Sequence, residues 1–169
     1  MTFDGNELIE INGSGMFETR DAFTIGGWFR TDVFQPFSGC PWQKRFGAAG
    51  ENSWQLCIDE SAAPHFYSTT PASELTGTPV SLMEWHYMTL SWSALSGQKQ
   101  MTVDGVPSGV PTTTPDIMFD SASVLIGADI DGAVLVSGLI GAIDDVRIYD
   151  RVLSSDEILA LATRPLESD

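Results

Sequence analysis

Basic residues are scarce in this chain. Its 169 residues include 8 Lys and Arg against 23 Asp and Glu, and the formal net charge is −15. Nucleic acids and anionic membranes bind proteins that carry basic patches, and Lys44-Arg45 is the one adjacent basic pair. We therefore expect neither nucleic acid nor a membrane surface as a partner. Most of the acidic residues are expected to favour solubility, and a few of them to bind a cation.

Long apolar runs are also missing. No stretch reaches the roughly 18 apolar residues that indicate a membrane span. The N-terminus, Met-Thr-Phe-Asp-Gly-Asn-Glu, lacks the basic and apolar regions of a signal peptide. We expect either an excised domain or a protein that reaches its location without the secretory route. The length predicts a single domain over residues 1–169.

What the chain does have is the pattern of an all-β protein. Hydrophobic residues make up 43%, and 16 Gly with 9 Pro divide the chain into short segments. Many short strands between turn residues are typical of a two-sheet antiparallel sandwich or jelly roll. The predicted strands are 8–11, 23–29, 54–58, 85–92, 100–103, 123–126, 133–136 and 140–149.

One short helix is predicted near the C-terminus. Ser154 and Glu157 have the spacing of a capping box, and an apolar stripe begins at Ile158. Arg164-Pro165 ends the helix. Such a helix is usually a packing element that covers a sheet edge, and we expect no function of its own.

A hairpin is predicted over residues 39–58, with its turn at residues 47–50. Paired positions then sum to 97, so Cys40 lies opposite Cys57, near enough for a disulfide whose oxidation depends on the compartment. The same register places Trp54 on the core face. It places Trp42 on the other face, where this indole is a candidate exposed aromatic.

The last predicted strand contains two adjacent acids, Asp144 and Asp145. Side chains alternate along a strand, so Asp144 is expected to share the core face with Val146 and Ile148. A carboxylate facing a core must be hydrogen-bonded, paired or bound to a cation. Asp145 falls on the opposite face with Arg147, where a solvated or ion-paired side chain is expected.

Several motifs occur in order along the chain: Phe3-Asp-Gly5, Phe23-Thr-Ile-Gly-Gly-Trp28, Trp85-His86, Val103-Asp-Gly105, and Ile143-Asp-Asp-Val-Arg-Ile-Tyr149 followed by Leu153-Ser-Ser-Asp-Glu-Ile158. Together they resemble motifs of the laminin-G-like, concanavalin A-like lectin and glucanase jelly rolls. The resemblance covers nearly the whole chain, and the last motif is the most specific. It implies a two-sheet antiparallel jelly roll with one short C-terminal helix and a curved face that often binds ligands.

The resemblance also implies a structural Ca²⁺ held by Asp144 together with Asp4. Ca²⁺ takes six to eight oxygen ligands, so two acids are part of a set. The alternative is that Asp144 accepts backbone N–H groups and no metal is bound. The segment 128–132 is a second candidate ligand loop, because Asp129 and Asp131 alternate before a glycine. Its alternative is an ordinary polar turn.

Catalytic patterns are lacking. Polysaccharide hydrolases of this fold resemble one another in a Glu-X-Asp-X-X-Glu strand, and the one Glu with an Asp two residues later is Glu167. Two histidines, His65 and His86, leave little for a metal triad or a Ser-His-Asp relay. We expect a non-enzymatic protein.

Without a catalytic pattern, the sequence leaves two candidate binding functions. The first is a surface component of a larger assembly, such as a capsid decoration or fibre protein of a bacteriophage virion, with protein neighbours and a possible homo-oligomer. The second is a carbohydrate-binding module of a secreted or adhesive protein, in which Trp42 or Phe66-Tyr67 stacks on a sugar ring. The sequence ranks the surface component first, on the virion or in the extracellular space, and the two overlap if a virion protein binds glycans.

Overall fold

The described part of the chain is almost entirely β-structure. The computed structural model describes residues 1–13, 21–33, 39–47, 51–69, 72–114, 116–131 and 133–166. The strands are β1 (Thr2–Asp4), β2 (Ile9–Ile11), β3 (Ala22–Thr31), β4 (Gly39–Phe46), β5 (Glu51–Ile58), β6 (Pro64–Thr69), β7 (Ala72–Thr76), β8 (His86–Ser93), β9 (Gln98–Val103), β10 (Val106–Pro107), β11 (Thr112–Thr113), β12 (Val124–Ile126), β13 (Asp129–Asp131), β14 (Val134–Val136) and β15 (Ile140–Tyr149).

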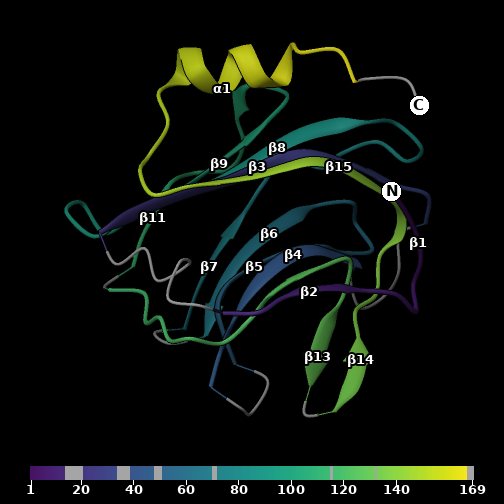
Figure 1. Cartoon of the computed structure of the whole chain (residues 1–169). Helices are drawn as coiled ribbons and strands as arrows, with labels where there is room; N and C mark the ends of the chain where they lie inside the picture. The colour runs from purple at the N-terminus through teal and green to yellow at the C-terminus, as the bar shows by residue number, and fades with distance from the viewer. Residues whose placement is uncertain are drawn as a thin grey trace.

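Two antiparallel sheets lie face to face, as the sequence predicted. Sheet A has the order β1-β15-β3-β8-β9-β10, with β11 also pairing with β9. Sheet B has the order β2-β12-β4-β5-β6-β7, and β13 and β14 form a separate hairpin. This hairpin projects beyond sheet B, on the side away from the helix (Figure 1). The first and last strands are neighbours, because Thr2 pairs with Ala142.

Aromatic residues from both sheets fill the core between them. Phe23 of sheet A lies 5.6 Å from Trp54 of sheet B and 6.2 Å from Trp92, measured between ring centroids. Phe29 meets Trp42 edge-on at 6.3 Å. Each of these rings is at most 2% exposed, so the two sheets share one continuous apolar interior.

The one helix within the described residues, α1 (Ser155–Ala162), covers the outer face of sheet A (Figure 1). The Ser154 side chain accepts the Glu157 backbone N–H, and the Glu157 carboxylate accepts the Ser154 backbone N–H, so the predicted capping box is present. The helix has eight residues. Within the described residues, none of the helical structure has the length and apolar character needed to cross a membrane.

Three register shifts change which side chains face the core. Between β4 and β5 the pairing shifts between Gly39 and Trp42, and again between Lys44 and Arg45. Between β15 and β3 it shifts between Asp144 and Arg147. Each β-bulge adds one residue to a strand and therefore reverses the alternation beyond it. These bulges decide where several predicted site residues point.

Candidate functional site

A row of polar side chains crosses the outer face of sheet B. Gln43 pairs with Gln55, Gln55 with Tyr67, and Tyr67 with Glu74, so the four are direct neighbours on β4, β5, β6 and β7. Directly opposed residues share a face of the sheet. The residues beside them in the chain, Trp42, Leu56, Phe66 and Leu75, belong to the core. The four residues, here called the polar row, therefore point away from the core over a length of about 14 Å.

Asp129 holds one end of the polar row in place. Its carboxylate accepts hydrogen bonds from Gln43 Nε2 (2.7 Å), Gln55 Nε2 (3.1 Å) and Asn52 Nδ2 (3.2 Å). It also accepts the backbone N–H of Ile130 at 2.6 Å. Because β13 carries Asp129, these bonds attach the β13–β14 hairpin to sheet B and fix the orientation of three side-chain amides.

Burial raises the pKa of the Asp129 carboxyl group, while its hydrogen bonds and the nearby charge of Arg45 partly oppose that shift. The carboxylate already faces the positive ends of three amide dipoles and one backbone N–H. Three side-chain amides therefore already contact this carboxylate, and its role as a cation ligand stays a prediction. Asp131 lies exposed at the other end of β13.

The other end of the polar row presents an aromatic ring to the surface. Tyr67 stacks on His65 with ring centroids 5.4 Å apart and an interplanar angle of 8°. His65 Nε2 lies 2.9 Å from Asp59, and His65 Nδ1 contacts Glu74. Burial opposes ionisation of Asp59, but hydrogen bonds from Ser61, His65 and backbone N–H groups outweigh it and lower its pKa to about 2. The carboxylates therefore hold the stacked rings in one orientation.

A shallow hollow of about 500 Å³ adjoins Tyr67, and Gln55, Thr69, Ser73 and Glu74 also line it. A planar amide can donate one hydrogen bond and accept another beside it, and a carboxylate can accept two parallel hydrogen bonds. Both patterns suit the vicinal hydroxyl groups of a sugar. An aromatic ring beside them offers an apolar surface to the C–H face of a sugar. The arrangement is suited to recognising a polyhydroxylated ligand.

The prediction that Trp42 is an exposed aromatic residue is wrong. Trp42 is fully buried in the core, because the bulge between Gly39 and Trp42 pairs it with Leu56 and places both on the same face. Phe66 is buried as well. Of the aromatic candidates from the sequence, Tyr67 alone lies on the outer face and is partly exposed. Trp54 is in the core, as predicted.

Cys40 and Cys57 lie across the hairpin from each other and form a disulfide, with a Cα–Cα distance of 4.0 Å. Gln55 Nε2 of the polar row lies 3.3 Å from Cys40 Sγ. The predicted turn falls partly on residues 48–50, which lie outside the described part of the chain. The disulfide therefore ties β4 to β5 directly beside the polar row.

The predicted core-facing position of Asp144 is also wrong. Asp144 is exposed and pairs with Trp28, and its carboxylate accepts the backbone N–H of Asp145 at 2.8 Å. Asp145 adopts a φ of 49° at the bulge, where Asp145 and Val146 lie opposite Gly27. Asp144 and Asp145 therefore both face away from the core, between the core-facing Ile143 and Val146. Asp145 pairs with Arg147 at 2.8 Å, as expected.

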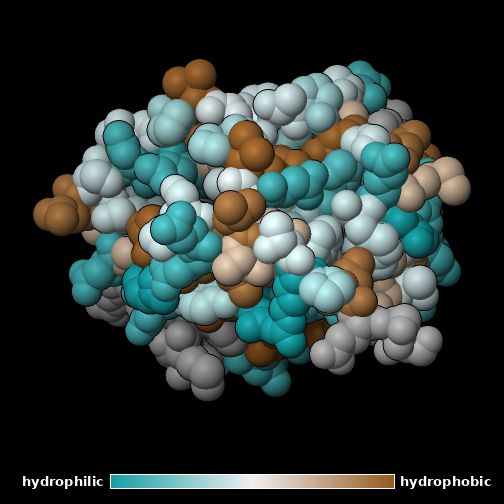
Figure 2. Space-filling model, turned by 90° about the horizontal axis from the view of Figure 1, so that it is seen from above, coloured by the Kyte–Doolittle hydropathy of each residue, from teal (hydrophilic) through white to brown (hydrophobic). Residues whose placement is uncertain are grey.

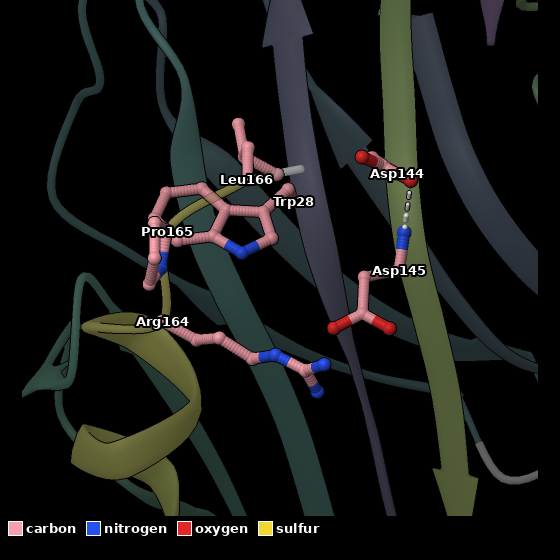
Figure 3. A pocket seen from close by; sticks show the side chains of 6 residues that line it. All are labelled: Trp28, Asp144, Asp145, Arg164, Pro165 and Leu166. Carbon is pink, nitrogen blue, oxygen red and sulfur yellow. Dashed lines mark hydrogen bonds between the residues drawn. The ribbon is translucent and has the colours of Figure 1, made fainter. Parts of the chain in front are cut away.

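Trp28 and the two acids line a small cavity on sheet A. Its volume is about 190 Å³, and Arg164, Pro165 and Leu166 line the opposite wall. Figure 3 shows Arg164 extending toward Asp145 across this space. The cavity lies on the helix side of the sandwich, so it is separate from the polar row (Figure 1).

Asp4 and Asp144 do not form a shared metal site. Asp4 pairs with Ile140, and Thr2 pairs with Ala142, so Asp144 lies beyond the start of β1. Four residues of strand separate the two positions by about 13 Å. Within the described ranges, no group of three or more His, Cys, Asp or Glu side chains is arranged to hold a metal ion.

The structure also brings together a serine, a histidine and an aspartate that sequence reasoning did not connect. His86 Nδ1 lies 2.8 Å from Asp104, and His86 Nε2 lies 3.0 Å from the Ser81 hydroxyl. The same nitrogen faces the Ser81 backbone N–H at 3.3 Å, and the hydroxyl bonds to Glu84. We interpret this cluster as a structural link between the start of β8 and the turn after β9. The Ser81 hydroxyl group, which would have to act as the nucleophile, is already hydrogen-bonded to Glu84.

The residues that sequence reasoning missed are Gln43, Asn52, Gln55, His65 and Glu74. A signal for some of them exists in the alternation His65-Phe66-Tyr67 and Glu74-Leu75-Thr76, where polar residues flank a buried one. That alternation predicts two short strands with a polar outer face. Gln43 has no such signal, because a bulge on each side of it disrupts the pattern.

Comparisons with known proteins agree with the jelly-roll fold. A family model described as the concanavalin A-like lectin/glucanases superfamily matches residues 3–159. No curated protein sequence matches the chain. Among solved structures, a carbohydrate-binding module (CBM40) of a Ruminococcus gnavus IT-sialidase, bound to α2,3-sialyllactose, is similar with a TM-score of 0.72 and 16% identity, over 92% of this chain and 96% of that one.

Two further solved structures share the fold. A putative carbohydrate binding protein from Bacteroides ovatus has a TM-score of 0.74 and 14% identity, over 94% of this chain and 45% of that one. A heptameric pentraxin from Limulus polyphemus has a TM-score of 0.69 and 14% identity, over 96% of this chain and 80% of that one.

Proposed function

Because the chain belongs to the concanavalin A-like lectin/glucanase superfamily, we propose that it is a glycan-binding domain whose site is the polar row on sheet B. The observation that carries the proposal is the geometry of the row. Gln43 and Gln55 are fixed by Asp129, and Tyr67 is fixed by its stack on His65. Preorganised polar groups around an aromatic ring bind a sugar without a large loss of side-chain entropy.

The solved structures support the same function. Two of the similar proteins are described as carbohydrate-binding, and one of them is bound to an oligosaccharide. The sequence ranked a surface component of an assembly first and glycan binding second, and these relatives favour reversing that order. A heptameric relative is consistent with self-association of this chain, and the Cys40–Cys57 disulfide is consistent with an extracellular or other oxidising location.

Binding without hydrolysis is part of the proposal. A glycosidase needs two carboxyl groups free to act as acid and as nucleophile or base. Around the polar row, Asp129 is hydrogen-bonded by three amides, and Asp59 and Glu74 both contact His65. Incubation of the protein with its bound oligosaccharide should therefore release no shorter products, as measured by mass spectrometry.

A glycan screen with a matched pair of variants tests the proposal. Wild-type protein should bind at least one class of oligosaccharide, and Tyr67→Ala should weaken that binding about tenfold or more, because the stacking ring is removed. Tyr149→Ala removes the same ring from β15 in sheet A and should leave binding unchanged. Absence of binding across a broad array, or equal losses in both variants at equal melting temperature, would contradict the proposed site.

A further inference from the structure

We infer that the polar row selects glycans by charge, binding those with free amino groups in preference to neutral ones and disfavouring those with carboxylates. The inference rests on the proposed function and names its ligand class. It follows from the side chains that surround Tyr67 and from the distribution of the few basic residues in the molecule.

Two carboxylates flank the aromatic end of the polar row and remain open to solvent. The Glu74 side chain is 44% exposed and the Asp59 side chain is 33% exposed. Both contact the ring of His65, which can offset at most one of the two charges. A ligand stacked on Tyr67 would therefore lie beside two carboxylates that face solvent.

Basic side chains near this face are buried rather than open to solvent. Lys44 Nζ donates to backbone carbonyls of Arg45 and Asp120 and lies 3.3 Å from the Asp120 carboxylate. Lys99 Nζ donates to Ser68 and Ser73 from inside the sandwich, where its charge acts on Glu74, but the lysine itself is fully buried. Arg45 is the one basic side chain that sheet B directs toward this face within the described residues, and its charge acts on the buried Asp129. Three further arginines form ion pairs away from this site: Arg30 with Asp32, Arg147 with Asp145, and Arg151 with Glu157.

Coulomb's law gives the expected size of the selectivity between charged and neutral glycans. Two unit charges about 4 Å apart in water interact by about 1 kcal/mol, which is a factor of about five in affinity. The formal charge of −15 adds a long-range attraction for cationic ligands at low salt. The similar carbohydrate-binding module was solved with sialyllactose, an acidic sugar. At 16% identity that likeness concerns the fold, and we expect this chain to prefer the opposite charge.

Matched oligosaccharides test the inference. Binding of a glucosamine hexamer, an N-acetylglucosamine hexamer, lactose and α2,3-sialyllactose would be measured by titration calorimetry at low and high salt, alongside the broad screen above. The glucosamine hexamer should bind at least about fivefold more tightly than its acetylated match at low salt, and the difference should shrink at high salt. Sialyllactose should bind no more tightly than lactose.

A matched pair of variants separates the site from the overall charge of the protein. Glu74→Gln removes one charge beside Tyr67 and should reduce the preference for the amino sugar by about fivefold. Asp156→Asn removes one charge from the first turn of α1, on the opposite side of the sandwich, and should preserve the preference. Equal effects of the two variants would assign the preference to net charge and overturn the inference.

A failure of the inference can be distinguished from a failure of the proposed function. Preference for sialyllactose over lactose, or no preference for the amino sugar over its acetylated match, overturns the inference and leaves glycan binding intact. If no glycan binds in these titrations or in the broad screen, the proposed function fails and the inference fails with it.

Discussion

Lys99 shows how a single buried side chain sets a pH dependence. It is fully buried, donates from Nζ to Ser68 Oγ (2.8 Å) and to the Ser73 carbonyl (3.0 Å), and lies 4.7 Å from the centre of the Phe66 ring. Burial lowers its pKa to about 8, and the charge of Glu74 only partly opposes this. Lys99 also ties sheet A to the strands that carry Tyr67 and Glu74.

The pKa of Lys99 gives a testable stability profile. Between about pH 8 and 10.5 the unfolded chain keeps a proton on this lysine that the folded chain has released, so unfolding takes up a proton. The free energy of unfolding should therefore rise with pH across this window, by an amount on the order of 3 kcal/mol. Denaturant unfolding at pH 7.5 and pH 10 measures the rise, and Lys99→Met should remove it. A variant that keeps the full rise would show that another group is responsible.

Single acids were the hardest residues to interpret from the sequence. Cation binding by Asp129 stays a prediction, and in the structure its carboxylate accepts hydrogen bonds from amides that lie far away in the sequence. Asp145 was expected to be solvated or ion-paired, and it pairs with Arg147 two residues away. Local partners are visible in a sequence, but partners on other strands depend on register.

At the scale of elements, strands were easier to predict than their register. The predicted strand over residues 140–149 coincides with β15, and the capping box begins α1 as expected. The bulges left no clear mark in the sequence, and two of them reversed a face assignment: Trp42 lies in the core and Asp144 lies outside it, contrary to the predictions. Aspartate tolerates positive φ better than most residues, so Asp145 is the one faint signal of a bulge.

The β4–β5 hairpin carries a prediction about its disulfide. Cys40 and Cys57 are 17 residues apart, and closing a loop of about this length restricts the unfolded chain by about 3 kcal/mol. Reduction should lower the free energy of unfolding by about that amount, while the ladder between β4 and β5 keeps the fold. The Cys40→Ser/Cys57→Ser double variant should match the reduced protein and show no response to reductant. Two free thiols in protein purified under oxidising conditions would contradict the disulfide.

At the scale of the whole molecule, the two outer faces of the sandwich differ in what covers them. Sheet A is covered by α1 and the segment that follows it, and Figure 2 shows apolar side chains there scattered among polar ones. Sheet B has the β13–β14 hairpin over one end of the polar row, and a shallow hollow beside Tyr67 at the other. The sequence predicted the jelly roll and a ligand-binding face, but it did not identify which side chains form that face.

The two faces also offer rival sites for a sugar. Trp28 with Asp144 and Asp145 on sheet A supplies the same types of group as the polar row, but in a cavity of about 190 Å³ that the C-terminal segment partly closes. The polar row is longer, lies on the more open face and has its side chains fixed by hydrogen bonds from several strands. Its position on sheet B is the central claim of this account.

Amide and indole chemical shifts, followed by NMR as the tightest-binding oligosaccharide is added, test that claim most directly. The account predicts that chemical-shift changes concentrate on β4 to β7, with the largest changes at Gln55, Tyr67 and Glu74. The chemical shift of the Trp28 indole N–H should not change. Shifts that concentrate at Trp28, Asp144 and Asp145 and leave the polar row unchanged would contradict it.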